Sequence, residues 1–97
     1  MAEVQKTTLA GETAQHFVEF IIMHQQQTLL AMGKHPNPPA KAPPPNLALA
    51  KAFIDQMSAI RDRTRGNLTP DEDRLLQTAL TGLQMSFVEA TRAAHAS

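Results

Sequence analysis

The sequence predicts an all-α protein with three helices. Apolar residues recur at helical spacing in three separate stretches of the 97-residue chain. Glycines follow the first two stretches, where a residue that accepts positive φ can close a helix. The third stretch begins with Thr69-Pro70-Asp71-Glu72, a typical helix start. A chain of this length forms a single domain with a thin core.

The first predicted helix covers residues 13–32. Residues 1–12 show no periodicity, so we expect a disordered tail there. Within the helix the apolar positions span about 200° of the helical wheel, which is more than one neighbouring helix can cover. This helix should therefore touch at least two others. Gly33 is its natural end.

Residues 34–45 form a proline-rich linker, which contains six of the seven prolines. The expected state is a stiff polyproline-like connector, which extends about 3 Å per residue and could reach roughly 40 Å. Such a connector could carry the chain back along the bundle or across to another subunit. A ligand for an SH3-like or WW-like domain is an alternative reading, but spacers are commoner.

The second and third helices are predicted over residues 46–65 and 69–92. Asn46 is a good N-cap. The third helix carries a narrow apolar stripe, and Leu75, Met85 and Val88 lie off it. The stripe consists of Leu76, Ala79, Leu80, Leu83, Phe87 and Ala90. Gly82 should weaken this helix unless a neighbouring backbone packs closely there. Residues 93–97 are expected to fray.

The stretch from Arg63 to Glu72 ends one helix and starts the next. Gly66 can adopt positive φ, and Thr69 with Glu72 forms a capping box. The turn is so short that the second and third helices must form an antiparallel hairpin. The first helix then packs on that hairpin or on the hairpin of another copy.

The chain resembles the bacterial domain of unknown function DUF1844. The resemblance covers about Phe17 to Val88, and it rests on a proline-containing spacer and on these residues: Gly33, Asn46-Leu47, Ala50, Ile54-Asp55, Arg63-Thr64-Arg65-Gly66-Asn67-Leu68-Thr69, Glu72, Leu76, Leu80, Leu83 and Phe87. It implies a small, helical, cytoplasmic bacterial protein. It brings no activity and no catalytic residues.

Composition argues against catalysis and against several ligands. The chain has no cysteine, and Ser58 and Ser86 have no base nearby in the sequence, so we expect no enzyme activity and no cofactor. The best metal-ligating set, His16, Glu19 and His24, is divided between two sides of one helix, so no metal is expected. The net charge is zero and no segment is suited to span a membrane, so we expect a cytoplasmic protein that does not bind membrane and for which nucleic acid is a disfavoured partner.

The first helix contains the candidate interface. Polar residues interrupt its apolar arc, and such a layer can fix the register and number of subunits. One hypothesis places the following residues at the interface of a homo-oligomer, most simply a dimer: Phe17, Phe20, Ile21, His24, Gln25 and Thr28. The equally weighted alternative is that the lower half of this helix faces solvent beside the linker.

The turn supplies a second candidate, the arginines Arg61, Arg63 and Arg65. Compensation of the helix dipole and local salt bridges explain these arginines without a ligand. The preferred function is therefore a non-enzymatic interaction or scaffolding module, which self-associates or docks a partner helix through apolar helix faces. The alternative is a regulatory protein that binds a ligand or nucleic acid through the three arginines.

Overall fold

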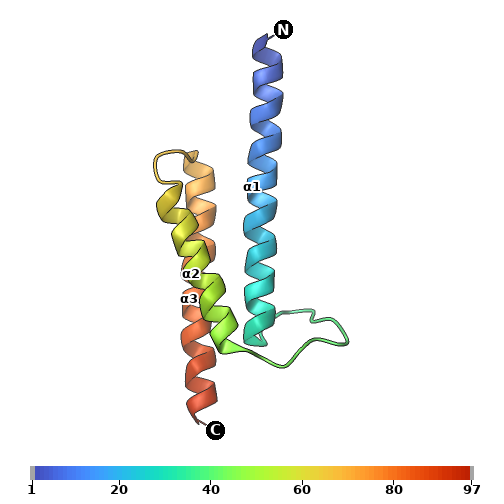
Figure 1. Ribbon diagram of the computed structural model, residues 1–97, viewed down its shortest axis with the longest axis vertical. Coiled ribbons are helices and arrows are strands. Elements are labelled where there is room, and N and C mark those ends of the chain that lie inside the picture. The colour runs from blue at the N-terminus through green and yellow to red at the C-terminus, as the bar shows by residue number, and fades with distance from the viewer. Residues whose placement is uncertain (1, 97) are drawn as a thin grey trace.

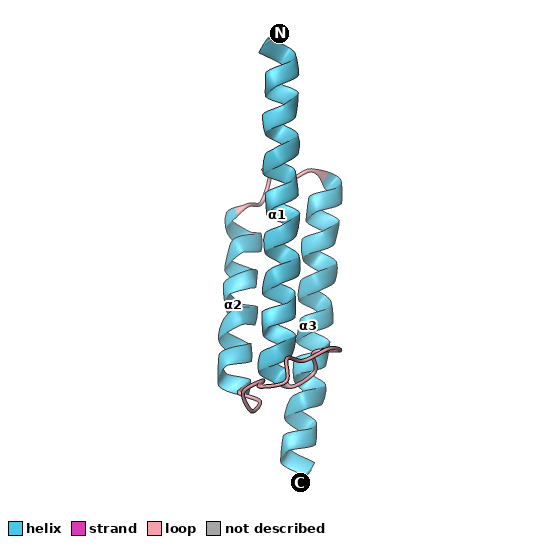
Figure 2. Ribbon diagram, turned by 90° about the vertical axis from the view of Figure 1, so that its right-hand side faces the viewer, coloured by secondary structure: helices cyan, strands magenta, loops and turns pink. Residues whose placement is uncertain are grey.

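The computed structural model describes residues 2–96, and it forms three α-helices with no strand in that range. They are α1 (Ala2–Met32), α2 (Leu47–Arg63) and α3 (Pro70–Ala96). The predicted all-α class with three helices is confirmed. α2 and α3 form an antiparallel hairpin, and α1 lies against both of them (Figures 1 and 2). The first helix thus packs on the hairpin of its own chain.

The core lies where the three helices meet. Four of the six residues predicted for the α3 stripe, Leu76, Ala79, Leu80 and Leu83, are buried, whereas Phe87 and Ala90 are only partly buried. The other two helices complete the core with Ile21, Ala31, Met32, Ala50, Ile54 and Met57. α1 contacts two helices, as the width of its apolar arc requires.

Local capping fixes the helix ends. Gly33 has φ 77°, and its N–H donates to the carbonyl of Leu30 while the N–H of Lys34 donates to that of Leu29. This pair of hydrogen bonds is a Schellman motif. Asn46 caps α2 through a bond from the N–H of Leu49 to its side chain at 3.0 Å.

The capping box at the start of α3 is also confirmed. Thr69 Oγ1 accepts from the N–H of Glu72, and Glu72 Oε1 accepts from the N–H of Thr69 at 2.9 Å. The end of α2 differs slightly from the prediction, since the helix stops at Arg63 and Thr64 is its cap. The Thr64 hydroxyl donates to the carbonyl of Ile60, and Gly66 takes φ 86° in the turn that follows.

Two helices are longer than expected. α1 begins at Ala2 instead of about residue 13, and α3 continues to Ala96 where fraying was expected from residue 93. Extending an existing helix adds one hydrogen bond per residue and needs no new nucleus, so residues without an apolar stripe can continue it. As a result α1 projects past the end of the hairpin (Figure 1). The expectations for Met1 and Ser97 lie outside the described residues.

The proline-rich linker leaves the bundle and returns to nearly the same place (Figure 1). The N–H of Asn46 donates to the carbonyl of Ala31 at 2.7 Å. The linker therefore joins adjacent ends of two antiparallel helices of one chain, and it does not cross the length of the bundle.

Candidate interaction surface

The polar residues of α1 find their partners within the chain. His24 Nε2 lies 3.0 Å from the carbonyl oxygen of Phe53 on α2, and because a carbonyl can only accept, Nε2 carries the proton. The imidazole stacks on Phe20 and meets the Phe53 ring edge-on, with centroids 5.6 and 5.3 Å apart. Thr28 is completely buried and donates to the carbonyl of His24 at 2.7 Å.

This geometry changes the interpretation of the six interface candidates. Ile21 and Thr28 are 0 % exposed within the single chain, so they offer no surface to a second copy. His24 is partly buried, and its Nε2 lies against the carbonyl of Phe53 on α2 of the same chain. Phe17, Phe20 and Gln25 keep part of their surface exposed and remain candidates.

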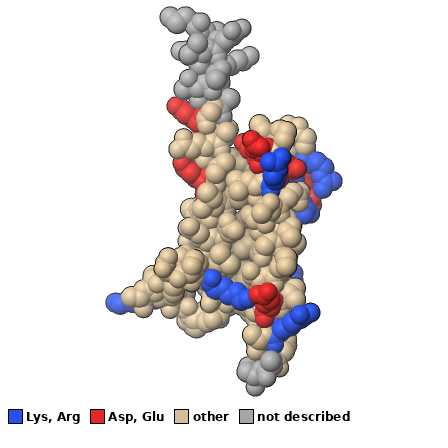
Figure 3. Space-filling model, turned by 180° about the vertical axis from the view of Figure 1, so that it is seen from behind, with Lys and Arg blue, Asp and Glu red and all other residues tan. Residues whose placement is uncertain are grey.

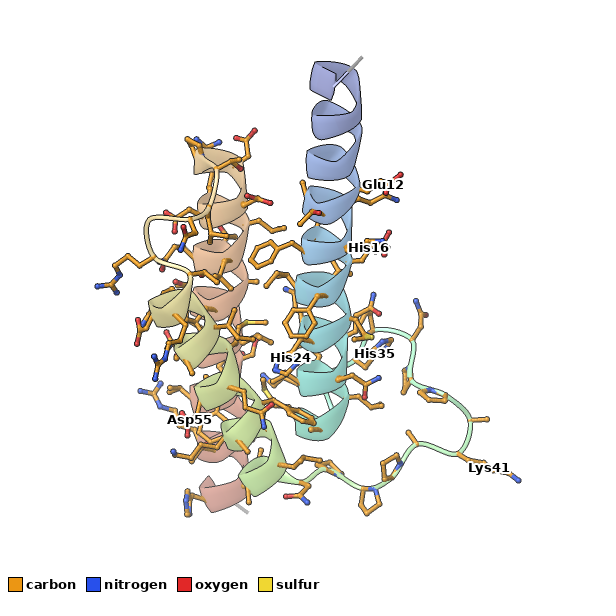
Figure 4. All side chains as sticks on the ribbon, turned by 45° about the horizontal axis from the view of Figure 1, so that its top comes forward. Glu12, His16, His24, His35, Lys41 and Asp55 are labelled. Atoms are coloured by element: carbon orange, nitrogen blue, oxygen red, sulfur yellow. The ribbon has the colours of Figure 1, made fainter. Side chains whose placement is uncertain are left out.

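The residues considered for a metal site do not converge. His16 Nδ1 lies 3.5 Å from Glu19 Oε2 on the outer face of α1, and both side chains are exposed. Figure 4 shows His16 pointing away from the hairpin and His24 lying on the side towards it. Within the described residues, no three histidine or acidic side chains are grouped so that they could hold a metal ion.

The arginines of the turn mainly serve the end of α2. Arg65 Nη2 and Arg61 Nε both donate to Asp62 Oδ1, at 3.1 and 3.3 Å. Arg63 is exposed and belongs to the last turn, where positive charge stabilises the helix dipole. A shallow cleft of about 410 Å³ lies beside the turn, lined by Arg61, Arg65, Gly66, Leu68, Pro70, Asp73 and Gln77. Asp62 and Asp73 balance the positive charge around it.

The model of the family DUF1844, a domain of unknown function, matches residues 14–89. The chain belongs to the DUF1844 family. A search of curated proteins returned no match to the chain. Solved structures likewise gave no match.

The DUF1844 match includes most of α1, the linker, all of α2 and most of α3. The matched region therefore contains the polar residues His24, Gln25 and Thr28 of α1 and the turn between α2 and α3. No helix of the described chain combines the length and apolar character that crossing a membrane requires.

Large apolar side chains are exposed on each of the three helices of this DUF1844 protein, including Leu49 of α2, which is 43 % exposed. On α3, Met85 is 63 % exposed and Val88 is 47 % exposed. On the outer face of α1, Ile22 and Met23 are similarly exposed. Sequence reasoning had placed Met85 and Val88 off the core stripe without giving them a role. The sequence pattern could have indicated this exposure, because apolar residues on the side of a helix opposite its buried stripe contact no other helix of their own bundle.

An exposed ion pair joins the ends of α1 and α3. Lys34 Nζ lies 2.9 Å from Glu89 Oε2. The hydrogen bond from Lys34, together with its positive charge, holds the pKa of Glu89 below its ordinary value. The charge of Arg92 acts in the same direction. Charged side chains therefore lie close to the exposed Met85 and Val88.

Proposed function

We propose that this DUF1844 protein is a non-enzymatic interaction module that associates with copies of itself through an apolar helix surface. The observation that carries this proposal is the exposure of Met85 and Val88 on α3, outside a core that is already filled. Apolar surface of this kind gains free energy when another surface covers it.

The arrangement of polar groups supports the same function. Among the described residues, no buried side-chain nitrogen or oxygen lacks a hydrogen-bond partner. His24 and Thr28 bond to backbone carbonyls, so their polar atoms are used in packing. The described side chains that take no part in the core include exposed apolar and charged groups on the surface. Recognition of another protein uses surfaces of this kind.

Sedimentation equilibrium tests the proposal. We expect the weight-average mass to rise from that of one chain to that of two as the concentration increases from the micromolar to the millimolar range. The variant Met85→Lys should shift this rise to higher concentration, while Met23→Lys on the outer face of α1 serves as a matched control. A mass of one chain throughout the range would contradict self-association.

The cellular setting belongs to the same proposal. We place the protein in the bacterial cytoplasm, and the resemblance of its sequence to DUF1844 supports this expectation. Cell fractionation with an antibody against the chain tests this location, and recovery in the membrane or extracellular fraction would contradict it.

The second candidate is a regulatory protein that binds a ligand or nucleic acid through Arg61, Arg63 and Arg65. The cleft beside the turn favours it, because two of these arginines line that cleft. The shared partner Asp62 opposes it by reducing the positive potential. Binding of a labelled oligonucleotide that weakens steeply with salt would support this candidate. Binding that is absent even at low salt would exclude the nucleic-acid form.

A further inference from the structure

The outer face of α3 is charged at both ends and uncharged in the middle. We use this name for nine exposed residues: Asp71, Arg74, Thr78, Thr81, Gly82, Met85, Val88, Glu89 and Arg92. They lie opposite the buried stripe of the helix. Figure 3, which views the molecule from the side on which α3 lies, shows charged side chains gathered near the two ends of the hairpin with an uncharged stretch between them.

The charges on this face are arranged symmetrically about its centre. Asp71 and Arg92 lie equally far along the helix from the point between Thr81 and Gly82, and Arg74 and Glu89 are also equidistant from that point. Each pair joins an acid with a base. Thr78 and Met85 form a third equidistant pair.

This pattern complements itself when the helix is turned end over end. In an isologous dimer, contacts occur in symmetric pairs. If residue i of one chain contacts residue j of the partner, then residue j of the first chain contacts residue i of the partner. Antiparallel docking centred between Thr81 and Gly82 would bring Arg74 to the partner's Glu89 and Asp71 to the partner's Arg92. A parallel arrangement would place each charge beside its own copy, which is unfavourable.

The centre of the face allows close approach. Gly82 and Thr81 are small, and a Cβ added at Gly82 would meet nothing within 4 Å. The chain thus has a glycine inside a helix, where alanine would be more favourable, and no neighbour among the described residues needs the space. A second helix could use it. Met85, three residues on, lies next to this open position, Val88 lies three residues further along, and the same helix would cover both.

We propose that a second copy of this chain docks antiparallel along the outer face of α3, with the two-fold axis passing between Thr81 and Gly82. The inference rests on the proposed self-association and specifies its surface and orientation. The existing pairs of Arg74 with Asp71 and of Glu89 with Lys34 are exposed, so these groups keep room for a second partner.

The outer face of α1 lacks the corresponding symmetry. Ile22 and Met23 are exposed there, but the charged residues, such as Glu12 and Glu19, lie on the N-terminal side only. Glutamines occupy the C-terminal side. Among residues 11–32, whose side chains the structure describes, this face therefore has no charge complementarity with a copy of itself, and it provides the matched control.

Cysteine cross-linking tests the surface directly, because the chain contains no cysteine of its own. Thr81→Cys places a thiol beside the axis, and we expect it to form a covalent dimer under mild oxidation. The Ile22→Cys variant carries its thiol on the exposed face of α1. We expect it to run as a monomer on non-reducing gels as well as on reducing ones. Circular dichroism of both reduced variants checks that the fold is kept.

Spin labels test the orientation. At 1.5 Å per residue, labels at position 71 of two antiparallel chains lie roughly 30 Å apart along the axis, whereas labels at position 81 lie within a few ångström of each other along it. Parallel docking would make both separations short. Pulsed electron resonance on Asp71→Cys and Thr81→Cys distinguishes the two arrangements, and two short distances would overturn the inference.

Charge exchange tests the pairing. Arg74→Glu should weaken the dimer about tenfold, since it places like charges at two symmetric positions, and addition of Glu89→Arg should restore it. The same test with Asp71→Arg and Arg92→Asp is independent of the first, and it leaves the ion pair between Lys34 and Glu89 in place. Failure of both double variants to recover would overturn the pairing.

The possible outcomes separate this inference from the proposed function. A dimer in which Thr81→Cys cross-links supports both. A dimer in which Ile22→Cys cross-links and Thr81→Cys does not would overturn docking through α3 and leave self-association standing. A chain that stays monomeric at all concentrations would overturn both.

Discussion

The backbone N–H of Asn46 donates a hydrogen bond to the carbonyl oxygen of Ala31, 2.7 Å away. This bond ties the end of the linker to the last turn of α1. Pro45 lies against Gly33 at the same place. The residues between these two points therefore form a loop whose ends are held together by the folded helices.

Deletion of residues 37–41 should leave the fold intact. The loop has no distance to span, so a shorter loop can still close, and the free energy of unfolding should fall by less than about 1 kcal/mol. Urea unfolding followed by circular dichroism measures the change. Insertion of five Gly and Ser residues after Ala40 is the matched control, with an expected cost of about 0.3 kcal/mol. Loss of cooperative unfolding in the deletion variant would show that the linker bridges distant points.

Gly33→Ala should destabilise the protein more than Gly66→Ala. Both glycines have positive φ, which costs a residue with a Cβ roughly 1–2 kcal/mol. At Gly33 the new Cβ would also lie 2.7 Å from Cγ of Pro45, whereas at Gly66 it would meet nothing within 4 Å. We expect a loss of about 1 kcal/mol at Gly66 and about 2–4 kcal/mol at Gly33 in urea unfolding. Equal losses would mean that Pro45 does not lie against Gly33.

The adjacent residues Ile21 and Ile22 test the packing of α1. Ile21 is completely buried between the helices, and Ile22 is 43 % exposed. Ile21→Ala should lower the free energy of unfolding by about 2–5 kcal/mol, and Ile22→Ala by less than about 1 kcal/mol. Both variants lose the same atoms from the same helix, so helix propensity affects them equally. A similar loss in both would contradict the observed docking of α1.

Acidification should weaken the bond between Lys34 and Glu89. The pKa of Glu89 lies below its ordinary value of 4.5 because Lys34 donates to the ionised carboxylate. A lowered pKa in the folded state means that the stabilisation is present above the ordinary value and is lost as the pH falls through the folded value. NMR titration of the Glu89 carboxyl carbon should show this lowered midpoint.

Lys34→Met supplies the control for that titration. It should return the midpoint of Glu89 towards the ordinary value, although the charge of Arg92 remains nearby. An unchanged midpoint in this variant would mean that Lys34 is not the cause.

Local signals made most of the fold predictable. Asn46, Thr69 with Glu72, Gly33 and Gly66 act within one helical turn, so their roles follow from sequence spacing alone. The α3 stripe was equally clear. The start of α1 was not, because continuation of a helix needs no apolar pattern.

The candidate site was less predictable because its partners are remote in the sequence. A helical wheel places His24 on the apolar side of α1, but it cannot show that the carbonyl of Phe53 on α2 accepts its hydrogen bond. The linker posed a similar problem, since its length gives only an upper limit on its reach. The exposure of Met85 became meaningful only once the buried side of α3 was established.

The position of α1 against both other helices has a consequence for synthesis on the ribosome. α1 emerges first, yet the helices that cover its apolar side are complete only at Ala96. At 5–20 residues per second, the ribosome needs roughly 3 to 13 s to make the rest of the chain. During that interval Ile21 and its neighbours have no native contacts, so the nascent chain is most exposed to chaperones and to aggregation before its hairpin exists.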